Sequence, residues 1–253
     1  MYDTEKSTYN YIKVDKSCQM KYMKMHQNIR SECYWVRATF PQIDPQQIAL
    51  DGKEVHHSMD PANDWSNLRM ISAWAVENGI VLGQVAVDDT SNEITALPSL
   101  LALVDVRDCD ITADALHCQT ATIEAIRAAD AHYTLCVKSN QKTLYQDIMA
   151  TFTTLRAEDH PSLQPQETVE KQHGRIETRR YWITEDLSRL TTRDSWHDLH
   201  SIGMVESERQ IGTKTSQKTR YSKSTVVVKS CQNVYISHMR KPATDKRNRY
   251  ADT

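Results

Sequence analysis

After residue 41 the chain begins with short runs of apolar residues. Segments with apolar residues three and four positions apart then alternate with further short apolar runs. Period-two or continuous apolar runs bounded by turn residues predict strands, and apolar residues three and four apart predict helices. The strands are expected at Gln47–Asp51, Met70–Glu77, Ile80–Val87, Asp110–Ala113, His132–Val137, Ile176–Thr184, Ser201–Arg209 and Arg220–Val228. The helices are expected from about Thr95 to Val104, over His117–Ala129, and around Leu144, Ile148, Phe152 and Leu155.

Local signals give some of these elements their expected ends. Asn78-Gly79 between two apolar runs predicts a tight hairpin in which both residues take positive φ. Pro98 is expected in the first turn of its helix, where its missing N–H costs nothing, so that helix should begin near Thr95. Ser139-Asn140 is placed to cap the third helix.

The order of these elements predicts a fold class. One strand and a hairpin precede a regular alternation of helices and strands, which is the order of a ribonuclease H-like sheet. We therefore expect an α/β protein with a mixed five-stranded sheet, flanking helices on both faces and extra C-terminal β-strands. A doubly wound nucleotide-binding fold would begin with a strand, a Gly-rich turn and a helix, and that pattern is absent from a chain with only 6 glycines.

Charge is unevenly distributed along the 253 residues. The net charge of −2 combines +3 over residues 1–40, −13 over 41–210 and +8 over 211–253. Basic ends indicate contact with a polyanion or, alternatively, solvated tails. We divide the chain into a weakly structured segment (1–40), a core (41–220) and a basic, poorly patterned tail (221–253).

Hydropathy and cysteine spacing indicate the cellular compartment in which the protein is expected. The mean hydropathy is −0.63, and no apolar run approaches the ~20 residues that span a bilayer, so no membrane role is expected. The opening lacks the apolar segment of a signal peptide, and the 6 cysteines show no C-x-x-C spacing. These features predict reduced thiols in a cytoplasmic protein.

Two aspartates stand where chemistry is expected. Asp51 ends the first predicted strand and Asp114 follows the fourth, and these strands are neighbours in a ribonuclease H-like sheet. Two close carboxylates repel unless a cation lies between them, and Mg²⁺ or Mn²⁺ prefers such oxygen ligands. The alternative is that both aspartates only form turns by accepting local backbone N–H bonds.

Several sequence blocks resemble one family. IALDGKEVHHSMD, SNEITALPSLLALVDVRDC, ITADALHCQ, VKSNQKTLYQDI and HGRIETRRYWIT occur in order, and with SIGMVESER they resemble the H-repeat-associated group of insertion-sequence DDE transposases over about residues 44–221. The resemblance implies a ribonuclease H-like core that cuts and joins DNA with two divalent ions, Mg²⁺ or Mn²⁺. It implies DNA, specifically transposon ends, as partner, and itself or a full-length transposase as a second partner.

The resemblance also assigns residues. Asp51 and Asp114 match the first and second metal-binding carboxylates. Lys138, in the Lys-x-Asn-Gln block, and Arg175, in the His-Gly-Arg-x-Glu block, are expected to contact DNA. Glu177 of that second block is a further catalytic candidate, although its place among strands also suits a structural or DNA-contact role.

The chain also departs from the family pattern. The family's third acid lies in a C-terminal Arg-x-His-Trp-x-x-Glu-Asn block, and this chain has no glutamate after Glu208. His117 stands beside Asp114 where the family has glycine, and we expect it to crowd the metal site. The chain is thus expected to be truncated at both ends and impaired in catalysis. The alternatives are an inactive remnant that at most binds DNA or a full-length transposase, and a plain metal-dependent hydrolase.

Overall fold

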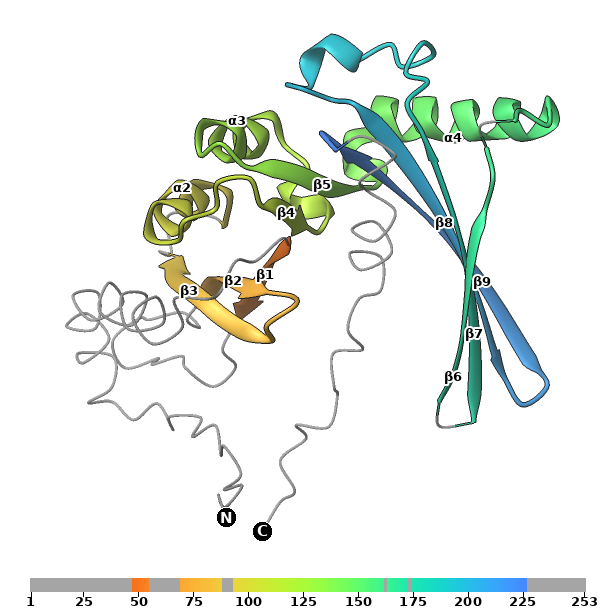
Figure 1. The fold of residues 1–253 in the computed structure, drawn as a ribbon, viewed down its shortest axis with the longest axis horizontal. Helices are drawn as coiled ribbons and strands as arrows, with labels where there is room; N and C mark the ends of the chain where they lie inside the picture. Colours follow the sequence, from red (N-terminus) through yellow and green to blue (C-terminus); the bar gives the residue numbers. More distant parts are fainter. Residues whose placement is uncertain (1–46, 55–68, 88–92, 162, 173, 227–253) are drawn as a thin grey trace, which may run out of the picture.

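The computed structural model describes residues 47–54, 69–87, 93–161, 163–172 and 174–226, and these form a single sheet with helices packed on it (Figure 1). The sheet has nine strands in the order β3-β2-β1-β4-β5-β9-β8-β7-β6. The strands are β1 (Gln47–Glu54), β2 (Arg69–Ala75), β3 (Ile80–Val87), β4 (Asp110–Ala113), β5 (His132–Val137), β6 (Gln166–Gln172), β7 (Arg175–Thr184), β8 (Ser201–Ile211) and β9 (Lys214–Ser224).

Five strands form the mixed sheet that the sequence predicted. β1 pairs in parallel with β4, and β4 pairs in parallel with β5, while β2 and β3 add to the outer side of β1 as an antiparallel hairpin. This half of the sheet confirms the ribonuclease H-like arrangement. The long strands β9, β8, β7 and β6 continue the sheet from β5 and extend away from the helices (Figure 1).

The hairpin between β2 and β3 is confirmed, but its turn differs from the expected one. β2 ends at Ala75, which lies opposite Ile80, so residues 76–79 all belong to the turn. Gly79 is the one residue of this fully described turn with positive φ, at 69°. The longer loop closes through the Gly79 N–H, which donates to the Ala75 carbonyl at 2.9 Å. It therefore does not need Asn78 in the left-handed region.

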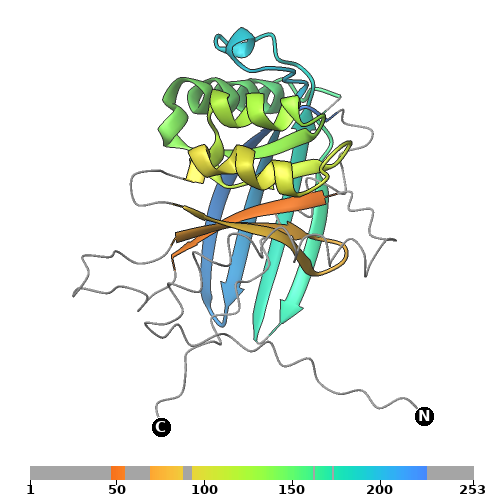
Figure 2. The same ribbon diagram turned by 90° about the vertical axis from the view of Figure 1, so that its left-hand side faces the viewer.

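Three helices cover one face of the sheet (Figure 2), so the described residues do not carry the expected helices on both faces. They are α2 (Glu93–Leu103), α3 (Thr120–Ala128) and α4 (Lys142–Ala157), with short 3-10 turns η2 (Ala115–His117), η3 (Ser139–Gln141) and η4 (Arg193–Ser195). The prediction for Pro98 was wrong, because α2 begins at Glu93 and places Pro98 in its second turn. The buried leucines on either side, Leu97 and Leu101, hold the helix there despite the lost backbone bond.

The main core lies between this helical layer and the sheet. Side chains that alternate along β1, β4 and β5, among them Ile48, Ile111 and Leu135, are completely buried in it. α4 brings its predicted stripe of Leu144, Ile148, Phe152 and Leu155 to the same core. The edge strand β6 was not predicted, because its sequence QETVEKQ has a single large apolar side chain, which is exposed.

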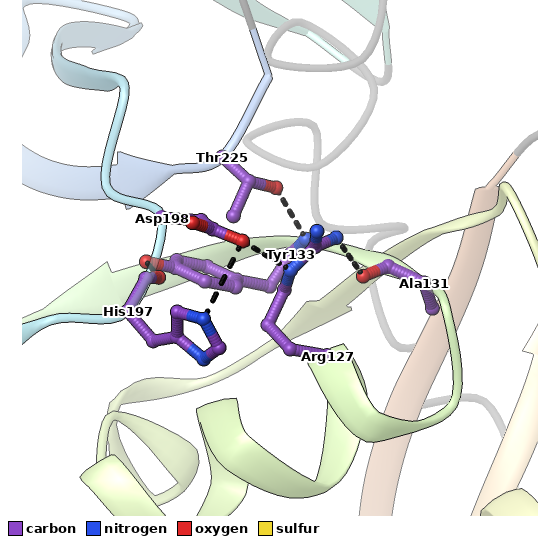
Figure 3. Close-up of polar contacts among 6 residues, drawn as sticks. All are labelled: Arg127, Ala131, Tyr133, His197, Asp198 and Thr225. Atoms are coloured by element: carbon purple, nitrogen blue, oxygen red, sulfur yellow. Dashed lines mark hydrogen bonds and ion pairs between the residues drawn. The ribbon is translucent and has the colours of Figure 1, made fainter.

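Polar contacts fasten the loop before β8 to the core (Figure 3). Arg127 of α3 donates from Nε to Asp198 Oδ2 at 2.9 Å and from Nη1 to the Ala131 carbonyl at 2.7 Å. The Tyr133 hydroxyl donates to the His197 carbonyl at 2.9 Å, and the Tyr133 N–H donates to Thr225 Oγ1 at 3.0 Å. Burial raises the pKa of the Tyr133 hydroxyl, so it remains a donor.

Candidate metal and nucleic-acid site

Asp51 lies on β1 with its side chain exposed. The strand runs three residues beyond it to Glu54, so the prediction that Asp51 ends the strand was wrong, because β2 continues to pair with β1 as far as Glu54. The parallel pairing of β1 with β4, however, ends at Ala49 and Thr112. Asp51 therefore lies just past the end of its parallel neighbour. Its Oδ2 lies 3.7 Å from Nζ of Lys53, and its side chain is 58% exposed.

Asp114 directly follows β4 and is also exposed. It caps η2 in extended conformation, with φ −74° and ψ −179°, and its Oδ1 accepts the Leu116 N–H at 2.9 Å. This is the local turn contact of the alternative interpretation. It occupies one oxygen only, since Oδ2 has no hydrogen-bond or ion-pair partner within the described ranges.

The strand register relates these two carboxylates. Ala49 is paired with Thr112, and two further residues along each strand lead to Asp51 and Asp114. Equivalent residues of parallel strands point to the same face, and neighbouring strands run about 4.8 Å apart. The fold thus carries both side chains to one face, at the end of the β1–β4 ladder. No third His, Cys, Asp or Glu joins them in a metal-sized cluster among the residues that the structure describes.

The donor set suits a hard divalent cation. Magnesium is commonly bound in proteins through one or two carboxylates, with waters and substrate phosphates completing its shell. Two exposed aspartates, one of them oriented by a backbone N–H, meet that description. Asp51 and Asp114 are the residues that would hold such an ion.

Glu177 is not brought to this pair. It lies on β7, and three strands separate β7 from β4 in the sheet. Its side chain is buried and accepts from Arg179 Nη2 at 2.7 Å, with Arg175 Nε 3.6 Å and Arg209 Nη2 3.9 Å away. Glu170, opposite Glu177 in the register, pairs with Arg179 at 3.2 Å. Neither glutamate takes the place of a third metal ligand in this arrangement.

Lys138 lies at the same edge as Asp114. It follows β5, which pairs in parallel with β4, and its side chain is exposed. The other two members of the block turn inward: Asn140 Nδ2 donates to the Ala115 carbonyl at 2.7 Å, and Gln141 Nε2 donates to the Cys118 carbonyl at 2.8 Å. Asn140 is therefore not the helix cap that its position suggested.

Arg175 belongs to a basic face of the sheet. Paired residues of neighbouring strands share a face, so the register from β5 through β9, β8, β7 and β6 identifies the side chains on the Asp114 side. The charged residues there are Arg175, Arg179, Arg209, Lys214, Lys218, Arg220, Glu170 and Glu177. The opposite face of β6 to β9 carries Lys171, Arg180, Lys223, Glu167, Glu206 and Glu208. Positive charge is therefore concentrated on the face that also presents the aspartates.

His117 is turned into the interior instead of crowding Asp114. It is 2% exposed, and its Nε2 lies 3.2 Å from Oε2 of Glu93 at the start of α2. The Glu93 carboxylate also lies against Gly52, where an added Cβ would collide with it. Gly52 follows Asp51 and so faces the other side of β1. The Glu93–His117 pair thus supports β1 and η2 from the helical side of the sheet.

Two buried ionisable groups were not predicted from the sequence. Asp110, at the start of β4, is 4% exposed and accepts from Thr134 Oγ1 at 3.1 Å, and burial raises its pKa to about 8. Lys223 of β9 is completely buried, and burial lowers its pKa to about 7. The alternation within the predicted last strand offered a signal for Lys223, because residues two apart share a face and Tyr221 is buried on that face.

Comparison with known sequences identifies the family. The sequence model described as Transposase DDE domain matches residues 42–232, so the chain belongs to the DDE transposase family. Among its relatives, YhhI of Escherichia coli K12, named for the H repeat-associated transposases, is 34% identical over 183 residues, which cover 71% of this chain and 48% of YhhI. This supports placement in that insertion-sequence group.

Other relatives show the same partial overlap. An uncharacterised protein from the dhlA 3′ region of Xanthobacter autotrophicus is 40% identical over 174 residues, covering 69% of this chain and 58% of that protein. The chain spans about half the length of the curated relatives it matches. A piggyBac transposase synaptic complex with hairpin DNA aligns with 84% of this chain and 41% of its own, at 9% identity and a TM-score of 0.37.

The family match continues past Tyr221 to residue 232, beyond the expected end of the resemblance. β9 likewise continues through Tyr221 to Ser224. Cys109, Cys118 and Cys136 are buried thiols, while Cys18, Cys33 and Cys231 lie outside the described residues. Among the described residues, no helix has the length and apolar character needed to cross a bilayer.

Proposed function

We propose that this chain is a metal-binding DNA-processing core of the DDE transposase type in which Asp51 and Asp114 hold Mg²⁺ or Mn²⁺ at a DNA phosphodiester. The observation that carries the proposal is the parallel β1–β4 register, which leads to these two carboxylates at equivalent positions on one face. A bound divalent ion would supply charge neutralisation at the phosphate and activation of a water or 3′-hydroxyl.

The protein's own residues would position the DNA. Arg175 and its basic neighbours offer fixed positive charge on the face that carries the aspartates, and Lys138 offers an exposed ammonium at the end of β5. Such contacts neutralise backbone phosphates without reading sequence. We infer that the substrate is DNA and that the protein acts in the cytoplasm. We also infer that its protein partner is a second copy of the chain or a full-length transposase.

We further propose that the chain does not carry out strand transfer. The sequence lacks the family's third acidic block, and Glu177 is engaged by Arg179 on a distant strand. Two-metal phosphoryl transfer needs both ions to be held, and two carboxylates leave the second ion poorly bound. The competing possibility is full transposase activity. Mn²⁺-dependent strand cleavage by the wild-type chain that disappears in Asp51→Ala would overturn the impairment.

Metal binding tests the central proposal directly. Free Mn²⁺ is measured by electron paramagnetic resonance in titrations of the wild type, Asp51→Asn, Asp114→Asn and the double variant. We expect binding in the wild type and its loss in the double variant. Glu124→Gln on α3 is the control, because Glu124 is an exposed carboxylate on the helical layer. Equal Mn²⁺ binding by the wild type and the double variant would contradict the proposal.

A further inference from the structure

The turn that carries Asp114 is held by two side chains from another part of the chain. Ala115 and Cys118 stand at the two ends of η2, and their carbonyls accept the amide hydrogens of Asn140 (2.7 Å) and Gln141 (2.8 Å). The Gln141 amide nitrogen also lies 3.4 Å from Gln119 Oε1. Consecutive residues after β5 thus fix both ends of the turn after β4.

The side-chain amides of Asn140 and Gln141 do not cap the helical segments η3 and α4 in which or before which they lie. Lys138 and Gln141 are the N-cap residues of η3 and α4, and neither makes a side-chain capping bond. Asn140 and Gln141 direct their donors across to η2 instead, over 25 and 23 residues of sequence. Both receiving groups are carbonyl oxygens, so only a donor satisfies them, and a carboxylate of the same shape would set acceptor against acceptor.

We propose that Asn140 and Gln141 are positioning residues that fix the orientation of the Asp114 carboxylate for its metal ion. Among the described residues, the Asp114 carboxylate bonds only within the turn, where Oδ1 accepts the Leu116 N–H at 2.9 Å. The direction of Oδ2 therefore follows the orientation of η2, which the two amides set. This inference rests on the proposed function, since it concerns the same carboxylate. Groups that orient metal ligands typically change metal affinity 10–100-fold when they are removed.

The variants Asn140→Asp and Gln141→Glu separate orientation from charge. Each keeps the side-chain shape, loses the donor and adds a negative charge near the ion. The added charge alone would tighten Mn²⁺ binding, whereas loss of the clamp weakens it, so the two effects have opposite signs. We expect Mn²⁺ affinity to fall by about tenfold in each variant. Gln146→Glu, the same change at an exposed position on α4, should bind Mn²⁺ as the wild type does.

Amide hydrogen exchange in the metal-free protein supplies the second measurement. We expect faster exchange at the Leu116 and Cys118 amides in Asn140→Asp and Gln141→Glu, with unchanged protection at Ile148 in α4. Asn140→Ala removes the donor without adding charge, so it should also show weaker Mn²⁺ binding and faster exchange at these amides. It replaces the charged variants in the test if they do not fold.

The outcomes are distinguishable. If wild-type Mn²⁺ binding depends on Asp51 and Asp114 but Asn140→Asp, Gln141→Glu and Asn140→Ala bind with wild-type affinity, the positioning role is wrong and the proposed function stands. If Mn²⁺ binding does not depend on the two aspartates, the proposed function fails, and the positioning role fails with it. Tighter Mn²⁺ binding by the charged variants would also overturn the inference.

Discussion

Lys223 places its Nζ 2.8 Å from the centre of the Trp196 ring, inside the core and away from water. The ring face attracts the cation, and the thiol of Cys118 is a weak polar partner for Nζ. The pKa of Lys223 falls to about 7 because burial disfavours the charged form. This lysine therefore opposes folding at neutral pH.

Lys223→Met should stabilise the protein. The methionine fills a similar volume without a charge to desolvate, and we expect a gain of about 2 kcal/mol in the free energy of unfolding at pH 6. Urea denaturation followed by circular dichroism measures it. Lys218→Met, at an exposed position on the same strand, should change stability by less than about 0.5 kcal/mol. A less stable Lys223→Met would show that the cation–ring contact outweighs the desolvation.

The pH dependence of stability should show two opposing slopes. The pKa of Asp110 is about 8 in the folded protein and 3.8 when it is free, so the native state binds the extra proton and stability falls as pH rises between those values. Lys223 has the reverse relation, with a pKa of about 7 folded and 10.5 free, so its contribution rises over that higher range.

Asp110→Asn isolates the first slope. Asparagine can keep the bond from Thr134 without titrating, so urea midpoints between pH 5 and pH 8 should decline less in the variant than in the wild type. Lys223→Met should instead flatten the rise above pH 7. If Asp110→Asn leaves the pH 5 to 8 decline unchanged, Asp110 does not titrate as its burial requires.

Glu177→Gln should be strongly destabilising. It removes the 2.7 Å carboxylate partner of Arg179, which is 7% exposed, and leaves that arginine with Glu170 at 3.2 Å. We expect a loss of about 2 kcal/mol, because a buried hydrogen bond between charged groups is weakened. Glu167→Gln breaks an equally short contact to Arg180, but both side chains are exposed, so the loss should stay below about 1 kcal/mol. Equal effects of the two substitutions in urea denaturation would contradict the role of burial.

The basic face should control the salt dependence of DNA binding. Lys218→Gln removes one positive charge from the face shared with the aspartates, so the slope of log K against log salt should become about 0.9 less steep on duplex DNA. Lys171→Gln removes one from the opposite face and should leave that slope unchanged. Fluorescence anisotropy at several salt concentrations measures both. A larger effect of Lys171→Gln would place the DNA on the other face.

The sequence by itself determined most of the elements, although not the edge strand β6, and it singled out the two aspartates. His132–Val137 was predicted with its observed bounds, because a short run of apolar and β-branched residues between polar flanks favours a buried strand. Asp51 and Asp114 were found through their motifs. Whether they share a face depends on the parallel register of β1 and β4, which is a contact between segments about 60 residues apart that no local pattern encodes.

The tertiary structure decided what the remaining motif residues do. In sequence Asn140 suits a helix cap and Glu177 suits a catalytic acid, yet Asn140 holds the turn after β4 and Glu177 is enclosed by arginines of its own sheet. Polar side chains can bond in several directions at similar free energy, so their partners are chosen only when packing brings distant segments together. Apolar side chains need only to be buried, and for that reason their pattern could be interpreted from the sequence.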